Sequence, residues 1–370
     1  MFDPRTAALL RSAPDVPGLD ADDLPQALTR HYATLVSRRL RGADTGTATR
    51  DDPWPVDRIA DVYEIVASLE PDPELRRAAA FVAGTAQQII ARRTAQEPAP
   101  VALPVDRNSV DAAAAAALLF LAAEQYADAN EAAAALTVPR EGSIQSRDIG
   151  RHIRDLARGN LGAILERSEA RRARDRGRPS RSLEASALRL LLSELALGIE
   201  ELASFVLAQG EAGVSELQSA RGRFRRVLDL AVHTSDLGLD LGGERPTLDH
   251  LTSRYPGPAH LSSLLLSVAD GIEDAPLGRI PPPTGADADF WNRWLAFRAQ
   301  TMPFVWQNHR AAIQRGFHET GSSAVLVLPT GAGKTTVSVL KIAGVLARGK
   351  KVVFLAPTHA LVDQLTDDLQ

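Results

Sequence analysis

Apolar residues recur at helical spacing through much of the chain before residue 273. In residues 56–69 they fall three or four positions apart, and Pro71 ends the helix that this spacing predicts. Asp72 and Pro73 are residue types preferred at a helix N-cap and in a first turn, so a second helix is expected to follow at once. Its apolar stripe extends from Leu75 to Ile90, with arginines outside it. This pattern predicts helices packed on helices.

The same pattern continues for some 180 further residues. Residues 109–136 are rich in alanine, whose small side chain lets neighbouring helices approach closely, and they are predicted to form one helix. The other predicted helices are 146–171, 182–208, 213–233 and 260–272. Three consecutive prolines occur in residues 276–289, which are expected to form a stiff, extended linker. We therefore expect a helical accessory or interaction region at 1–275 and a second domain from residue 290.

The second domain is expected to open on a helix, because Phe290, Trp294 and Phe297 share the spacing of one helix face. Two later runs, residues 324–328 and 351–356, are aliphatic and β-branched, which is typical of buried parallel strands. The aromatic face is expected to pack on the domain that these strands begin.

The turn after the first apolar run carries candidate chemistry. Gly331 and Gly333 lack a Cβ, so backbone N–H groups there can approach an anion at the start of the following helix. Lys334 places an ammonium where the β- and γ-phosphates of a nucleotide would lie, and the Thr335 hydroxyl can ligate Mg²⁺. A plain surface loop is the alternative. The order of apolar run, glycine loop and helix favours a nucleoside-triphosphate site.

Three motifs together resemble superfamily 2 helicases and translocases. The sequence PTGAGKT is similar to their motif I, in which the first glycine of the strict phosphate-loop pattern is relaxed, and Leu328 stands at that position. PTHALVDQ is similar to motif Ia, although His359 replaces the usual arginine. PFVWQNHRAAI is similar to the segment in which a glutamine contacts adenine. The resemblance covers residues 290–370.

The resemblance implies ATP and Mg²⁺ as cofactors. Lys334 and Thr335 would be the catalytic residues, and Thr335 would also be the Mg²⁺ ligand. A plain position on an amphipathic helix is the alternative for Gln307, and Phe290 or Trp306 is a second candidate for contact with adenine. The nucleotide-binding residues would be Gln307, Thr330, Gly331, Ala332, Gly333, Lys334, Thr335 and Thr336. The residues contacting nucleic acid would be Pro357, Thr358 and His359.

The fold that the resemblance implies is the start of an α/β RecA-like P-loop NTPase domain, with an incomplete parallel sheet, behind a mostly α-helical region. The family also needs a second acidic motif, Walker B, at the end of a strand. After Lys334 the only acidic residues are Asp363, Asp367 and Asp368, which fall on a predicted helix. Two strands do not make a stable sheet. We therefore expect the N-terminal part of a longer enzyme, inactive by itself.

The implied activity is ATP hydrolysis coupled to movement along DNA or RNA, with DNA favoured. One alternative is a translocating ATPase of a restriction or antiphage complex, in which the helical region binds a nuclease or another protein. A second alternative is an interaction module switched by ATP and without unwinding activity. The three motifs do not distinguish these functions.

Composition limits the partners. The formal net charge is −4, so contact with nucleic acid requires a local basic patch. Two arginine-rich segments, 167–181 and 221–226, are candidates, with a solvated surface as the alternative for each. The absence of cysteine excludes disulfides and cysteine-ligated zinc. No apolar stretch suits a signal peptide or a membrane span. Arginine supplies 38 of the 42 basic residues, which is typical of a GC-rich bacterial genome. We expect a soluble, cytoplasmic protein.

Overall fold

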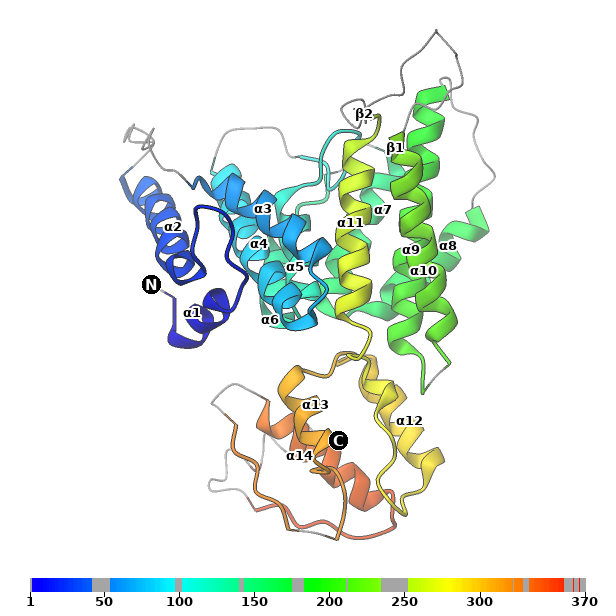
Figure 1. Cartoon of the computed structure of the whole chain (residues 1–370). Coiled ribbons are helices and arrows are strands. Elements are labelled where there is room, and N and C mark those ends of the chain that lie inside the picture. The colour runs from blue at the N-terminus through cyan, green and yellow to red at the C-terminus, as the bar shows by residue number, and fades with distance from the viewer. Residues whose placement is uncertain are drawn as a thin grey trace. The chain divides into compact units, whose positions relative to one another are not determined.

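The computed structural model divides the chain into two compact units (Figure 1). The first comprises Met1–Phe205 and Val214–Asp274, and the second comprises Val206–Gly213 and Ala275–Gln370. The described residues are 2–41, 54–96, 102–139, 143–174, 183–210, 212–233, 252–321, 323–328, 333–355, 362 and 366.

Helices make up nearly all the regular structure described in the first unit, and one of them, α9, extends two residues beyond Phe205. Their bounds are α1 (Pro4–Arg11), η1 (Ala21–Asp23), α2 (Leu24–Arg41), α3 (Val56–Leu69), α4 (Pro73–Thr94), α5 (Ala112–Ala122), α6 (Tyr126–Ala135), α7 (Ile144–Arg158), α8 (Leu161–Arg174), α9 (Leu183–Leu207), α10 (Val214–Ala231) and α11 (Pro256–Gly271). Between α10 and α11, β1 (Val232–His233) pairs antiparallel with β2 (Thr252–Ser253).

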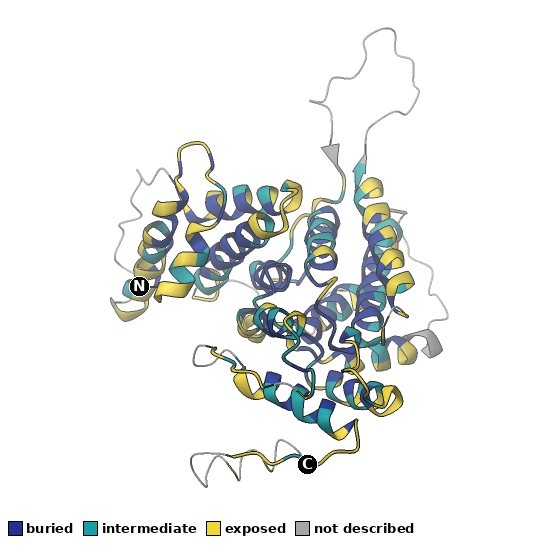
Figure 2. Ribbon diagram, turned by 60° about the horizontal axis from the view of Figure 1, so that its bottom comes forward, coloured by how far each residue is buried: buried dark blue, intermediate teal, exposed yellow. Residues whose placement is uncertain are grey.

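The Ala-rich helix α5 lies at the centre of the first unit, because every residue from Ala113 to Ala122 is buried (Figure 2). Close approach of the neighbouring helix α4 depends on a glycine. A Cβ added to Gly84 would lie 3.0 Å from Phe120 Cδ1, at the limit of contact. The interpretation of the alanines as packing residues is confirmed.

The first predicted helix boundary is confirmed, and two other predictions are wrong. Helix α3 ends at Leu69, and the Asp72 carboxylate caps α4 by accepting from the N–H groups of Glu74 and Leu75. The single helix predicted at 109–136 is broken between α5 and α6 at Glu124, which has a φ of 58°. The helix predicted at 146–171 is broken by Gly159, whose φ of 74° ends α7 in the left-handed conformation.

The break at Glu124 has a tertiary cause. Its side chain is buried and forms an ion pair with Arg77 of α4, with 3.3 Å between Nη1 and Oε1. A buried carboxylate needs such a partner. Helical periodicity carries no signal for this contact, because the partner lies 47 positions away in the sequence.

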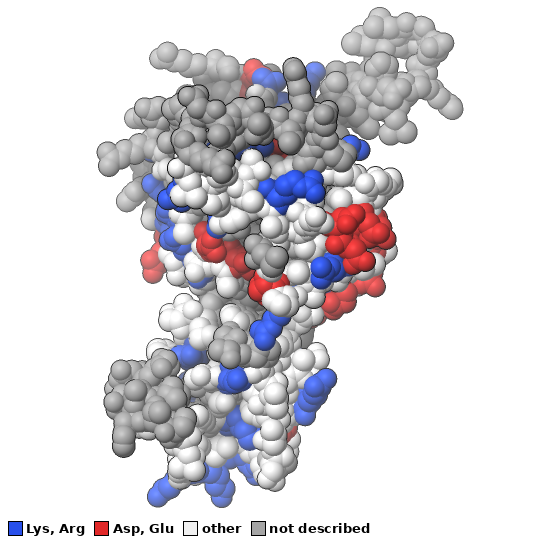
Figure 3. Space-filling model, turned by 90° about the vertical axis from the view of Figure 1, so that its left-hand side faces the viewer, with Lys and Arg blue, Asp and Glu red and all other residues white. Residues whose placement is uncertain are grey.

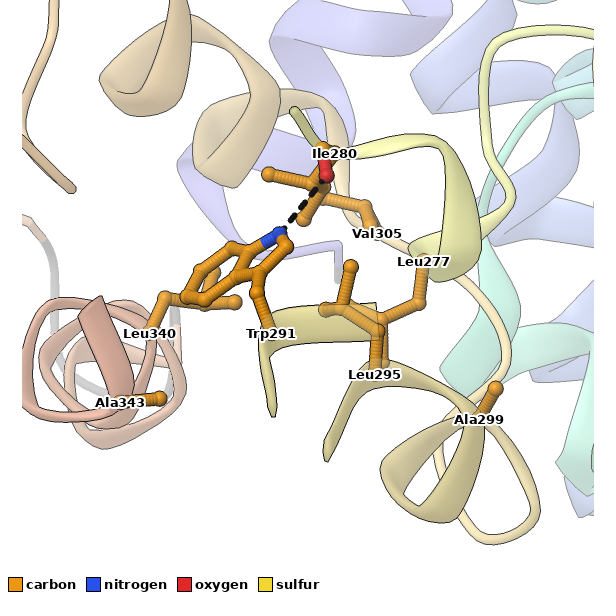
Figure 4. Packing of buried hydrophobic residues seen from close by; sticks show 8 residues of the cluster. All are labelled: Leu277, Ile280, Trp291, Leu295, Ala299, Val305, Leu340 and Ala343. Carbon is orange, nitrogen blue, oxygen red and sulfur yellow. Dashed lines mark hydrogen bonds between the residues drawn. The ribbon is translucent and has the colours of Figure 1, made fainter. Parts of the chain in front are cut away.

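The second unit is built on η3 (Leu277–Arg279), α12 (Ala288–Ala299), α13 (Gln307–Gln314) and α14 (Lys334–Leu346). Figure 4 shows its core, where Trp291 of α12 lies between Leu340 of α14 and Ile280, the residue after η3. Trp291 Nε1 donates a hydrogen bond to the Ile280 carbonyl over 3.0 Å. Leu277 and Ile280, from the proline-rich segment expected to be an extended linker, are buried in this core.

The face on which α12 packs differs from the predicted one. The buried positions are Trp291, Leu295 and Ala299, whereas Phe297 is 71% exposed and Phe290 is 36% exposed. Trp294 is partly buried against the same core. Two overlapping aromatic and aliphatic stripes share this helix, and spacing alone could not tell which one faces the core.

The predicted RecA-like parallel sheet is absent from the described residues. Residues 323–328 and 351–355 are described but are not strands, and β1 and β2 lie elsewhere. Val325, Val327, Val353 and Leu355 are between 85% and 91% exposed. A strand is stabilised by backbone hydrogen bonds to neighbouring strands and by burial of its faces. Within the described residues these two runs form no strand and most of their side chains are exposed, so the predicted fold class is wrong beyond its mostly α-helical character.

Candidate nucleotide site

The first turn of α14 presents the residues of the glycine-lysine-threonine motif. Gly333 is the N-cap residue, with φ 74° and ψ 36°, and no side chain caps the helix. Lys334 and Thr335 are exposed, and the first turn holds no acidic residue. An uncapped helix N-terminus offers unpaired N–H groups and partial positive charge to an anion. This turn can therefore receive phosphate oxygens.

The second turn of α14 anchors the helix. Val337 is fully buried and Val339 and Leu340 nearly so, while the exposed Lys334 and Thr335 lie one turn earlier. The Ser338 hydroxyl donates to the Lys334 carbonyl over 3.0 Å. The second turn of α14 is therefore buried in the unit, while its first turn lies at the surface.

Helix α13 contacts the start of α14 through His309. A Cβ added to Gly333 would lie 2.4 Å from His309 Nε2 and 2.6 Å from Cε1, closer than real Cβ contacts. His309 is 2% exposed, and its ring stacks on Trp306 with 5.4 Å between centroids and 2° between planes. Gln307, the predicted adenine contact, is the exposed first residue of the same helix. The structure thus brings the segment that carries Gln307 to the residue before Lys334.

The chain between α13 and the first apolar run is fastened to α14. Lys341 Nζ donates to the carbonyls of Phe317 and Glu319 over 3.0 and 2.8 Å. A hydrogen bond from the Thr284 N–H lowers the pKa of Glu319. Burial lowers the pKa of His318, which lies between these contacts. These bonds position the segment that leads into the glycine loop.

A small cavity lies behind the first turn of α14. Its volume of about 20 Å³ is close to the space that one water molecule occupies. His309, Thr336, Val339 and Leu340 line it, together with residues of α12 and its following loop. A nucleotide needs several hundred Å³. The cavity is therefore a gap in packing, and the nucleotide would bind at the exposed surface of the turn.

Some predicted site residues lie outside the described residues. These are Thr330, Gly331 and Ala332 of the glycine loop, and Pro357, Thr358 and His359 of the second motif. Within the described residues, no group of three or more His, Asp or Glu side chains is arranged to hold a metal ion. The Thr335 hydroxyl is an oxygen ligand of the kind that Mg²⁺ prefers, in an exposed position that suits a cation carried by phosphate.

The arginines of α10 are mostly engaged inside the first unit. Arg221 forms ion pairs with Asp270 of α11 at 2.7 Å and with Glu273, just after α11, at 2.8 Å. Arg223 forms ion pairs with Glu194 and Glu201 of α9 at 2.9 and 2.8 Å. These carboxylates raise the pKa values of both arginines against the opposing effect of burial, which is the largest single influence. The candidate basic patch at 221–226 is therefore largely neutralised.

The other arginine-rich segment is described only in part. Arg167 pairs with Asp155 at 2.6 Å and contacts His152 Nδ1 over 3.2 Å, so it joins α8 to α7. Residues 175–181 of this segment lie outside the described residues.

The second unit carries a net positive charge, unlike the first. It holds ten Lys and Arg against seven Asp and Glu, while the first unit holds 32 against 39. Figure 3 shows basic side chains spread over the second unit, in the lower part of the view, and a patch of acidic side chains on the first. Any electrostatic contact with nucleic acid is favoured on the unit that carries Lys334.

Residues 299–370 match the family described as "Type III restriction enzyme, res subunit". The match supports a relationship of this segment to superfamily 2 helicase-like ATPases. It contains Gln307, His309 and the first turn of α14, and it covers less than a fifth of the chain. No curated protein matches the chain significantly. No described helix is both long and apolar enough to span a membrane.

Sequence reasoning missed two residues of this site, His309 and Lys341. His309 follows Gln307 by two positions, and its spacing of three from the apolar Trp306 was the available signal for a buried face. Lys341 lies two turns into α14, and nothing in the sequence pattern points to the carbonyls that it contacts.

Proposed function

We propose that this protein is an ATP-dependent, superfamily 2 helicase-like ATPase that couples ATP hydrolysis to movement along nucleic acid, with DNA favoured. The observation that carries the proposal is the exposed pair Lys334 and Thr335 on the uncapped first turn of α14, inside the segment that matches the family. Its cytoplasmic location remains a prediction.

In this proposal, the first-turn N–H groups of α14 and Lys334 bind the β- and γ-phosphates. Thr335 holds Mg²⁺, which neutralises charge on the transferred phosphoryl group when it is bound. Gln307 contacts adenine, and the loop residues Thr330, Gly331 and Ala332 surround the phosphates. Pro357, Thr358 and His359 contact the nucleic-acid backbone. DNA is favoured over RNA by the description of the matching family.

Hydrolysis of ATP by the full-length protein tests the proposal, measured with and without single-stranded DNA, duplex DNA and RNA. We expect one nucleic acid to stimulate hydrolysis, and we expect Lys334→Ala to reduce the stimulated rate by at least about 100-fold, because an exposed positive charge on the phosphates is lost. The melting temperature should not change, since Lys334 is exposed. Stimulated hydrolysis that persists in Lys334→Ala would refute the assignment of the site.

A second candidate function is favoured by the name of the matching family. A motor of a restriction or defence system would serve a nuclease, and it would hydrolyse ATP by the same residues. Cleavage of DNA by the full-length protein or its copurified partner, dependent on ATP and lost in Lys334→Ala, would select this function. Hydrolysis that no nucleic acid stimulates would favour the ATP-switched interaction module instead.

A further inference from the structure

Gly333 and His309 lie in a contact that leaves no room for a side chain on the glycine. The position of an added Cβ falls 2.4 Å from His309 Nε2, and the left-handed φ of 74° is itself one that other residues rarely adopt. Gly333 immediately precedes Lys334 and begins the helix that would bind phosphate. The imidazole ring of His309 therefore packs directly against the backbone of Gly333 and forms a wall beside it.

This wall is held in place from behind. The His309 ring stacks on Trp306 with nearly parallel planes, and it is 2% exposed. Arg310, the next residue, donates from Nη1 to the Val305 carbonyl over 2.9 Å, which ties α13 to the segment before it. The small cavity lined by His309 and Thr336 lies next to the ring, so a shorter side chain would widen this cavity and remove the support of Gly333.

We infer that His309 is a positioning residue for nucleotide binding. Its ring sets the place of Gly333, and thereby the direction of the first N–H groups of α14 and of Lys334. The same helix carries Gln307, the predicted adenine contact. Trp306 stacks on His309, and His309 packs against Gly333, so these contacts connect Gln307 to the proposed phosphate-binding turn. This inference rests on the proposed function and adds a residue to it.

The test is a set of paired substitutions in the full-length protein. The dissociation constant of a fluorescent ATP analogue is measured by titration with Mg²⁺ present, and the melting temperature is measured for each variant. His309→Ala removes the wall, and His309→Phe keeps a flat ring that can stack on Trp306. Gly333→Ala places a Cβ against the ring, and the double variant His309→Ala/Gly333→Ala gives that Cβ room.

Two glycines of the same unit provide matched controls. Gly316 has a φ of 75° and Gly349 a φ of 67°, close to that of Gly333. Among the described residues, an added Cβ at Gly316 would meet only Glu319 Cγ at 3.7 Å, and at Gly349 it would meet no atom within 4 Å. Gly316→Ala and Gly349→Ala therefore carry the backbone strain without the clash.

We expect His309→Ala to weaken binding of the analogue about tenfold and His309→Phe to bind within about threefold of the wild type, because a small displacement of binding groups is costly. Gly333→Ala should weaken binding by at least about tenfold, and both control glycine variants should bind like the wild type. The double variant should bind more tightly than Gly333→Ala alone, because contacting residues give non-additive effects.

Three results would overturn the inference, and they differ from failure of the proposed function. Wild-type affinity in His309→Ala would refute a positioning role, and so would equal losses in His309→Ala and His309→Phe. If His309→Ala melts at a much lower temperature, its affinity is not informative, and Gly333→Ala is compared with Gly316→Ala and Gly349→Ala instead. Equal affinities of these three variants for the analogue would refute the role of the contact between His309 and Gly333. A wild-type protein that does not bind the analogue refutes the proposed function, and the inference falls with it.

Discussion

His318 is a buried histidine in the second unit, with an exposed fraction of 5%. The centroid of its ring lies 6.5 Å from that of Trp291. Burial is the largest cause of its lowered pKa. Lys341 lowers the pKa further, while Glu319 acts in the opposite direction. The neutral ring therefore belongs to the folded state.

Acid is expected to destabilise the second unit through His318. Because its folded pKa lies below the ordinary value of 6.5, the unfolded chain takes up the proton first, and stability is lost as the pH falls below about 6.5. One linked proton changes the free energy of unfolding by at most about 1.4 kcal/mol per pH unit. We expect this slope to be reduced in His318→Leu, measured between pH 7.5 and 5 by urea unfolding followed by tryptophan fluorescence.

Three of the four tryptophans lie in the second unit, so fluorescence reports mainly on that unit. The control is His31→Leu in the first unit, which should keep the wild-type slope. An unchanged slope in His318→Leu would mean that another group governs the acid sensitivity of this unit.

Helix α5 depends on a half-buried carboxylate at its start. Asp111 accepts hydrogen bonds from the N–H groups of Ala113 and Ala114 over 2.9 and 3.2 Å. Burial raises the pKa of Asp111, and the two hydrogen bonds oppose this effect without cancelling it. The Asp111 cap thus stabilises α5, a helix whose residues are nearly all buried. Partial burial of the Asp111 carboxylate opposes this stabilisation, because its ionised form loses contact with water.

Two substitutions of Asp111 separate the hydrogen bonds from the charge. Asp111→Ala should lower the free energy of unfolding by about 1 kcal/mol, because both hydrogen bonds are lost. Asp111→Asn keeps an acceptor without the charge. Because the folded pKa is raised, the contribution of Asp111 to stability falls as the pH rises through that pKa, so Asp111→Asn should be at least as stable as the wild type at pH 7. Urea unfolding of both variants gives the measurement.

The matched control is Asp72, which caps α4 with the same two bonds but is exposed. Asp72→Ala should also cost about 1 kcal/mol, because its cap is lost. A loss in Asp111→Asn as large as that in Asp111→Ala would show that the charge itself stabilises α5.

At the scale of the molecule, the two units differ in the sign of their charge. The second holds an excess of basic residues, and the first an excess of acidic ones, although the whole chain is slightly negative. Lys350 and Lys351 are exposed just beyond α14, whereas Arg225 and Arg226 belong to the segment of α10 whose neighbours are paired with carboxylates. These two pairs of residues test which unit meets nucleic acid.

Binding of single-stranded DNA by the full-length protein should depend on Lys350 and Lys351. On single-stranded DNA each phosphate contact contributes about 0.7 to the slope of log affinity against log salt concentration, so Lys350→Ala/Lys351→Ala should reduce the magnitude of that slope by about 1.4. Arg225→Ala/Arg226→Ala should leave it unchanged. Fluorescence anisotropy at several salt concentrations provides the slopes, and the opposite pattern would place the nucleic-acid contact on the first unit.

The sequence by itself determined those features that depend on neighbouring residues. Pro71, Asp72 and Pro73 fixed the boundary between α3 and α4, because proline geometry and a capping carboxylate act within one turn. Gly333, Lys334 and Thr335 marked the start of α14 and pointed to phosphate chemistry, which depends on order and spacing along a few residues. The helices at 56–69 and 73–94 were readable for the same reason.

Only the tertiary structure decided the features that depend on distant partners. At Glu124 a predicted helix is broken, and the buried carboxylate there forms an ion pair with Arg77 of another helix. Helix α12 buries Trp291, which packs against Ile280 and Leu340, and leaves Phe297 exposed. The two apolar runs form no sheet in the described residues, since strand propensity is realised only where other strands pair with it. The contact of His309 with Gly333 likewise needed both helices in place, because its two partners are 24 positions apart in the sequence.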